Sequence, residues 1–171
     1  MQKLELSRRN VLLLGSGAVA LLLGVYPAMR QIGCYPAPPE PFEHLGAKSA
    51  AIYALLGDFL APPGGPLPGS GGDLESLRRL DRLLGSVPST TATLLRALPL
   101  AFEHSTALDR YGARSLYHLP PDRQREFLVE WAEADDLIRA QLFMALRSTV
   151  GMMYFERPEV VRAMHIAPGC G

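Results

Sequence analysis

The sequence is poor in the side chains that bind metals and haem. Its 171 residues include only two cysteines, Cys34 and Cys170, and four histidines. Covalent haem needs a Cys-x-x-Cys-His motif and structural zinc needs thiolates or imidazoles at short spacing, and neither pattern is present. Glu103 and His104 are adjacent, but neighbours on a helix project about 100° apart. We therefore expect this chain to bind no metal and no haem.

Charge of either sign is not in excess, because 17 basic residues balance 17 acidic ones. A nucleic-acid surface needs a clustered basic excess, so we expect no nucleic-acid partner. The glycine-rich stretch 64–72 lacks the Lys-Ser/Thr ending of a phosphate-binding loop. No Gly-x-Ser-x-Gly nucleophile elbow is present either. These absences argue against an enzyme that acts alone and leave open only an enzyme of unfamiliar type.

The first thirty-three residues are typical of an export signal. An almost unbroken apolar run covers residues 11–25 and follows a polar, basic start. About fifteen residues fall short of the roughly 20 that span a membrane comfortably. The adjacent arginines directly before this run resemble the twin-arginine consensus, an address that an export receptor reads. We expect a twin-arginine signal at 1–33, a periplasmic or other extracytoplasmic location, and recognition by the twin-arginine translocon through Ser7, Arg8, Arg9, Val11 and Leu12.

The fate of this signal stays open. No clean Ala-x-Ala cleavage site precedes the mature region, so the segment is either cut or retained as a membrane anchor. Gln31-Ile32-Gly33-Cys34 superficially resembles a lipoprotein box, but glutamine stands where an aliphatic residue is required.

The rest of the chain divides into a tether and a helical domain. Residues 34–44 are proline-rich, which blocks helix and predicts an extended tether. Residues 45–171 show apolar residues at helical spacing and no run that alternates with period two. We predict an all-α fold, a single irregular bundle of four to five main helices.

Proline, glycine and capping residues divide this domain into helices. The first expected helix stops at Pro62-Pro63 and is followed by a loop over 61–72. Local signals predict four more helices and a short final one. We expect a helix from the N-cap Asp73 to the C-cap Gly85, one from Ser89 or Thr90 that contains Pro99, one that begins in 119–124, one that Asp135 or Asp136 starts or continues, and a short one over 158–164.

More than one interpretation is open for three aromatic residues and for the two cysteines. Trp131, Tyr154 and Phe155 either pack in the core or anchor a partner interface, where aromatic residues are enriched. Cys34 and Cys170 can form a disulfide outside the cytoplasm, but they can equally stay unpaired or bond to a partner.

Several motifs follow one another along the chain: Leu60-Ala61-Pro62-Pro63, Leu116-x-x-Leu119 before Arg123-Gln124 and Phe127-Leu128, and Tyr154-Phe155-x-Arg157-Pro158-Glu159-Val160. Their order resembles the gluconate 2-dehydrogenase subunit 3 family, the small subunits of flavoprotein dehydrogenase complexes. The likeness covers roughly residues 45–168 and joins a twin-arginine leader to a Pro/Gly-rich loop. Leu116 stands where the family commonly has Phe, and a Gly-Tyr pair is missing near His165-Ile166.

The resemblance implies a function that needs no cofactor in this chain. In the family, the large subunit is a flavoprotein of the glucose-methanol-choline type without an export signal, and the small subunit's signal carries the folded pair across the membrane. We therefore expect FAD in a partner subunit, with electrons leaving through a cytochrome c or a quinone-linked subunit. The alternative is a self-sufficient, membrane-tethered extracytoplasmic helical module with a binding or structural role.

Overall fold

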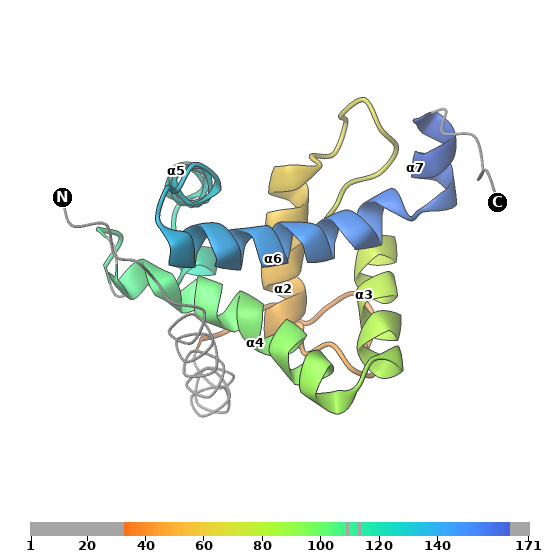
Figure 1. The fold of residues 1–171 in the computed structure, drawn as a ribbon, viewed down its shortest axis with the longest axis horizontal. Helices are drawn as coiled ribbons and strands as arrows, with labels where there is room; N and C mark the ends of the chain where they lie inside the picture. Colours follow the sequence, from red (N-terminus) through yellow and green to blue (C-terminus); the bar gives the residue numbers. More distant parts are fainter. Residues whose placement is uncertain (1–32, 109, 113, 165–171) are drawn as a thin grey trace, which may run out of the picture.

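The computed structural model describes residues 33–108, 110–112 and 114–164. The expected signal residues 7–12 and Cys170 lie outside this part. The described residues contain no strand and form six α-helices and two short 3₁₀ helices (Figure 1). The α-helices are α2 (Ala47–Leu60), α3 (Leu74–Ser86), α4 (Ser89–His104), α5 (Pro121–Ala132), α6 (Leu137–Phe155) and α7 (Pro158–Ala163), and the 3₁₀ helices are η1 (Ser105–Leu108) and η2 (Leu116–His118).

The predicted all-α fold is confirmed, with five long helices and a short last one. The Asp73 side chain caps α3 as expected, because its carboxylate accepts a 3.0 Å hydrogen bond from the backbone of Ser76. Asp136, rather than Asp135, caps α6 in the same way. The prediction that Gly85 ends α3 is wrong, since the helix continues to Ser86. It ends there because the next residue precedes a proline, which favours extended backbone.

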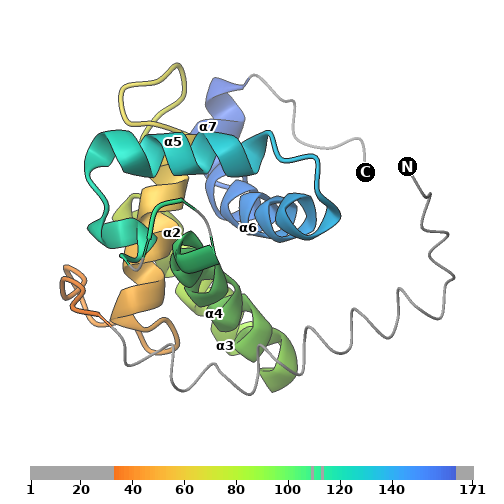
Figure 2. The same ribbon diagram turned by 90° about the vertical axis from the view of Figure 1, so that its left-hand side faces the viewer.

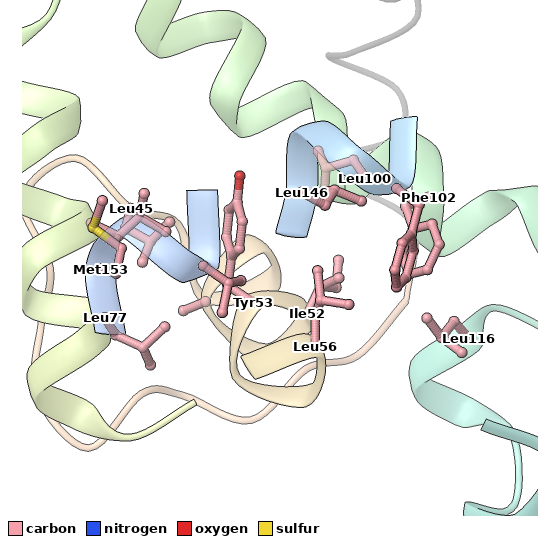
Figure 3. Packing of buried hydrophobic residues seen from close by; sticks show 14 of the residues in the cluster. Leu45, Ile52, Tyr53, Leu56, Leu77, Leu100, Phe102, Leu116, Leu146 and Met153 are labelled. Carbon is pink, nitrogen blue, oxygen red and sulfur yellow. The ribbon is translucent and has the colours of Figure 1, made fainter. Parts of the chain in front are cut away.

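Helix α2 lies at the centre of the bundle and contacts α3, α4, α5 and α6. Figures 1 and 2 show α6 crossing one side of α2 as the outermost helix there. Buried apolar side chains from all five long helices form one core. Figure 3 shows its central part, where Ile52 and Leu56 of α2 lie among Leu77, Leu100 and Leu146.

A side chain of α2 compensates for the proline inside α4. Pro99 has no N–H, so it cannot donate to the carbonyl of Leu95 four residues earlier. The buried hydroxyl of Tyr53 donates to this carbonyl at 2.8 Å. Burial raises the pKa of Tyr53 above its ordinary value, so the hydroxyl keeps the proton that it donates. The bond therefore joins α2 to α4 at the point where α4 is weakest.

We predict that Tyr53→Phe lowers the free energy of unfolding by about 1 to 2 kcal/mol, because a buried carbonyl loses its donor. In a Pro99→Ala background the same change should cost less, since the alanine N–H can bond Leu95 within the helix. Urea denaturation of the two single variants and the double variant measures both costs. Equal costs in the two backgrounds would show that the hydroxyl does not serve Leu95.

Candidate functional site

The segment directly after the expected signal is fastened to the helices. Residues 34–44 form neither helix nor strand, and we call them the strap. The backbone N–H groups of residues 43–45 donate to the carboxylate of Asp81 in α3, two of them at 2.7 Å. Arg78, also in α3, donates to Glu40 at 2.6 Å. The strap thus follows the surface of the domain to the start of α2.

The first residues of the strap lie against a buried carboxylate. Glu103 of α4 is 0 % exposed. It accepts a 2.5 Å hydrogen bond from the hydroxyl of Tyr35 and 3.1 Å bonds from the backbone N–H of Tyr117. Lys48 lies over the Tyr35 ring and contacts His104 at 2.8 Å. Burial and the bond to Glu103 raise the pKa of Tyr35, so its hydroxyl remains a donor to the carboxylate.

Cys34 lies at the exposed edge of this cluster. Its backbone carbonyl is 2.9 Å from Nε2 of His118 in η2, and its side chain is exposed. Cys170 lies outside the described residues, so the Cys34–Cys170 disulfide stays a prediction.

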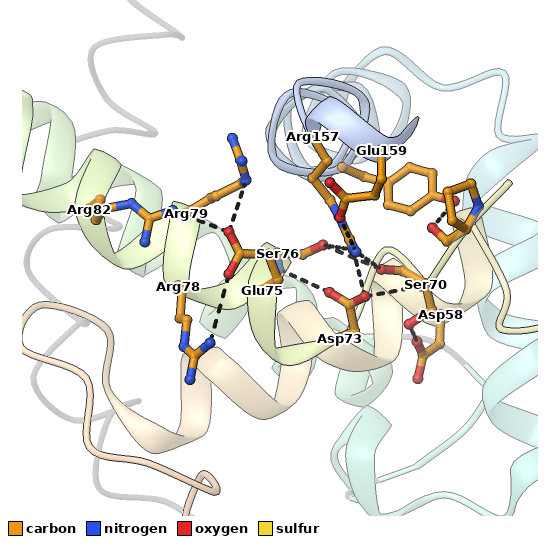
Figure 4. Close-up of polar contacts among 12 residues, drawn as sticks. Asp58, Ser70, Asp73, Glu75, Ser76, Arg78, Arg79, Arg82, Arg157 and Glu159 are labelled. Carbon is orange, nitrogen blue, oxygen red and sulfur yellow. Dashed lines mark hydrogen bonds and ion pairs between the residues drawn. The ribbon is translucent and has the colours of Figure 1, made fainter. Parts of the chain in front are cut away.

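A second cluster joins α3, the loop after α2 and the start of α7 (Figure 4). The guanidinium of Arg157 is buried and donates to Asp73 at 2.5 Å. It also donates to Glu159 at 2.7 Å and to the carbonyl of Ser70 at 3.4 Å. Asp73 is the N-cap of α3, so one carboxylate serves both a helix end and a buried cation. The sequence identified Asp73 as a cap but gave no sign of its distant cationic partner.

These contacts change the protonation of Asp73. Burial alone would raise the pKa of its carboxyl, but the hydrogen bonds from Arg157 and from the backbone of Ser76 and Ser70 outweigh burial and lower the pKa below its ordinary value. A group whose pKa is lowered by folding stabilises the folded state above its unfolded pKa. That contribution is lost as the pH falls through the folded pKa.

The structure separates the three aromatic residues that the sequence grouped. Trp131 is 5 % exposed and packs edge-on against Phe102, with ring centroids 5.0 Å apart. Tyr154 is 2 % exposed, and its hydroxyl donates to the carbonyl of Pro68 at 3.2 Å. Both belong to the interior of this chain rather than to a surface. Phe155 alone is exposed, at 48 %.

Phe155 belongs to a long apolar surface on α6. When the residues of α6 are placed at 100° each around the helix axis, the exposed large apolar side chains of α6 fall on one side of the helix. Small or uncharged residues lie on the same side. Figures 1 and 2 show that no other described helix covers this side. We call it the α6 outer face, and its members are Leu137, Ile138, Gln141, Met144, Ala145, Ser148, Gly151, Met152 and Phe155.

Gly151 on this face has no role in the packing of the chain itself. A glycine inside a helix costs about 1 kcal/mol relative to alanine. A Cβ added to Gly151 would meet only the Phe155 ring, at 3.8 Å, which is ordinary contact. Gly57 of α2 differs, because its Cβ would lie 2.3 Å from the backbone of Gly71. The domain needs glycine at 57 but not at 151.

The described residues include an apolar cleft but no metal cluster. The cleft, of about 470 Å³, lies between residues 36–39 of the strap and small side chains of α2, including Ala50 and Ala54. Among the described residues, no group of three His, Cys, Asp or Glu side chains could hold a metal ion. None of the described helices has the length and apolar character needed to cross a membrane.

We predict that Arg157→Leu lowers the free energy of unfolding by about 3 kcal/mol at pH 7, because it leaves a half-buried carboxylate without its cation. The loss should shrink as the pH falls, because burial is less opposed once Arg157 is gone and Asp73 becomes protonated at a higher pH in the variant than in the parent chain. Urea denaturation at pH 7 and at acidic pH measures this. Arg147→Leu on the exposed side of α6 is the control, and an equal, pH-independent loss in both variants would contradict the assignment.

We predict that Tyr35→Phe loosens the strap while the helices stay folded. The Tyr35 hydroxyl fastens the start of the strap to the buried Glu103, so its loss should let the strap leave the surface more often. Amide exchange at residues 43–45, whose N–H groups bond Asp81, should then rise on the order of tenfold. Tyr117→Phe is the matched control, because Tyr117 contacts Glu103 through its backbone N–H. Hydrogen exchange read by mass spectrometry compares the two, and unchanged strap exchange in Tyr35→Phe would refute the role of this bond.

Comparison of the chain with protein-family models, curated proteins and solved structures gave no match. The likeness to the small subunits of flavoprotein dehydrogenases therefore rests on the sequence motifs alone.

Proposed function

We propose that this chain is a non-catalytic small subunit of an extracytoplasmic flavoprotein dehydrogenase complex. It escorts the folded catalytic subunit through twin-arginine export and stabilises that subunit afterwards. The catalytic subunit, of the glucose-methanol-choline type, holds the FAD. Its electrons leave through a cytochrome c or a quinone-linked subunit.

The observation that carries this proposal is the junction between the leader and the folded domain. The strap begins directly after the expected signal and is bound by Asp81 of α3, Glu103 of α4 and His118 of η2. These residues are far apart in the sequence, so they meet only once the helices have packed. A leader followed by such a segment emerges from a folded domain, and folded cargo is what the twin-arginine route carries. A small helical protein with this kind of leader suits the escort of a larger folded partner.

The junction between the leader and the folded domain is also compatible with the alternative function, a membrane-tethered binding or structural module. If the leader is retained as an anchor, the strap holds the domain close to the membrane surface rather than on a long flexible tether. A membrane-held binding or structural module would use that arrangement without a flavoprotein. The two functions differ in whether a second protein depends on this leader.

We predict that replacing both leader arginines, Arg8→Lys with Arg9→Lys, leaves this chain and its flavoprotein in the cytoplasm. The receptor reads the arginine pair, and the flavoprotein has no signal of its own in this scheme. Cell fractionation followed by immunoblotting locates this chain. Co-purification with the tagged chain and flavin absorbance identify the flavoprotein.

Arg30→Lys is the matched control, because it makes the same change outside the signal motif. Export of both proteins should be unaffected by it. If the flavoprotein still reaches the periplasm when this leader is disabled, the escort proposal fails. If no flavoprotein accompanies the tagged chain at all, the tethered module is favoured.

A further inference from the structure

The spacing of the residues on the α6 outer face is the same in both directions along the helix. Its central row is spaced by steps of three, four, three, four and three residues, a series that is identical when reversed. The row ends in a large apolar residue on each side and has its smallest side chains in the middle. Its members are Ile138, Gln141, Ala145, Ser148, Met152 and Phe155.

Such an order allows the face to pack against a copy of itself. In an antiparallel pair centred between residues 146 and 147, Ile138 lies opposite Phe155 of the second copy. Gln141 then lies opposite Met152, and Ala145 opposite Ser148, so large side chains meet near the ends and small ones meet in the middle. Small residues at the centre let two helix backbones approach closely, and a two-fold interface requires this kind of self-complementarity.

Met144 and Gly151 extend the same pattern beside the row. They lie on one flank of the face. In the antiparallel pair Met144 of one copy lies two residues, about 3 Å along the axis, from Gly151 of the other, and its side chain leans toward its own N-terminus and so toward that glycine. The space that Gly151 leaves is not needed inside the chain, since a Cβ there would fit. A helix interior that keeps a destabilising glycine without an internal need is explained if a side chain from outside fills that space.

The charge and size of the face agree with a second copy. The two charged residues of the helix, Arg139 and Arg147, lie outside it at 100° per residue, so no charge is buried on pairing. Five large apolar side chains, each between 45 and 79 % exposed, give each copy on the order of 600 Å² of apolar surface. Two copies together reach about 1,200 Å², the lower end of the range for specific interfaces.

We propose that two copies of this chain associate through antiparallel pairing of their α6 outer faces. The interface is independent of the proposed export function, because the strap lies on α3, α4 and η2. The occupant of the face is the second copy, and Gly151 is the position that accepts Met144 from it.

The first test uses opposite effects of one substitution. In Gly151→Ala, the monomer should become more resistant to urea, because alanine favours helix. The same variant should associate roughly tenfold or more weakly in sedimentation equilibrium of the full chain, because the added methyl occupies the Met144 site. Ile138→Glu should abolish the dimer. Val129→Glu, on α5 and outside the face, is the control and should leave the dimer intact.

The second test reads the register. In full-length chain carrying Cys34→Ser and Cys170→Ser, single cysteines are introduced and joined with a short bis-maleimide. Ser148→Cys should link to itself, because the two copies meet near this residue. Ile138→Cys should not link to itself but should link to Phe155→Cys when the two variants are mixed.

Three results would overturn the pairing. One is a chain that stays monomeric at all concentrations, and another is a link of Ile138→Cys to itself. The third is a one-to-one complex with a flavoprotein that Ile138→Glu disrupts, which would assign the face to that partner instead. Loss of export in the leader variant bears on none of these results, so the two proposals can fail separately.

Discussion

The buried guanidinium of Arg157 fixes where the end of α6 lies relative to the rest of the bundle. It lies two residues after the end of α6 and bonds Asp73 at the start of α3 and Ser70 in the loop after α2. A buried cation is tolerated only where hydrogen bonds and an opposite charge replace water. This requirement holds three segments together at one corner, and with the core contacts of α6 it sets the orientation of the α6 outer face.

Close packing at the same corner depends on glycines. The backbone of Gly57 in α2 approaches Gly71 and Gly72 so closely that a Cβ on any of the three would overlap the other segment. The loop can therefore lie flat on α2 and present Ser70 and Asp73 to Arg157. Gly151 differs from Gly57. The absence of a side chain is required at Gly57, but no contact within the chain requires it at Gly151. The fold does not require glycine at position 151, and we therefore assign its role to a contact with the second copy.

Local sequence patterns predicted the helices well, but they did not predict the contacts between residues that are far apart in the sequence. The apolar spacing, Asp73 as a cap and the prolines near helix ends depend on a few neighbouring residues. The prediction that Gly85 ends α3 was wrong because Pro88 favours extended backbone at Val87, which ends the helix at Ser86. The bonds Tyr35–Glu103 and Arg157–Asp73 join residues 68 and 84 positions apart, which no local pattern encodes. Trp131 and Tyr154 show the same limit, since aromatic character alone does not distinguish core from interface.

The strap and the α6 outer face occupy different elements, and this separation matters for both proposals. The strap is held by α3, α4 and η2, whereas the face consists of α6 residues that point away from the core. Pairing through α6 therefore leaves the contacts of the strap with α3, α4 and η2 in place. An uncharged apolar face left open during passage through an export channel would invite nonspecific contact. In the proposed export of folded cargo, pairing with the second copy before transport would remove that hazard.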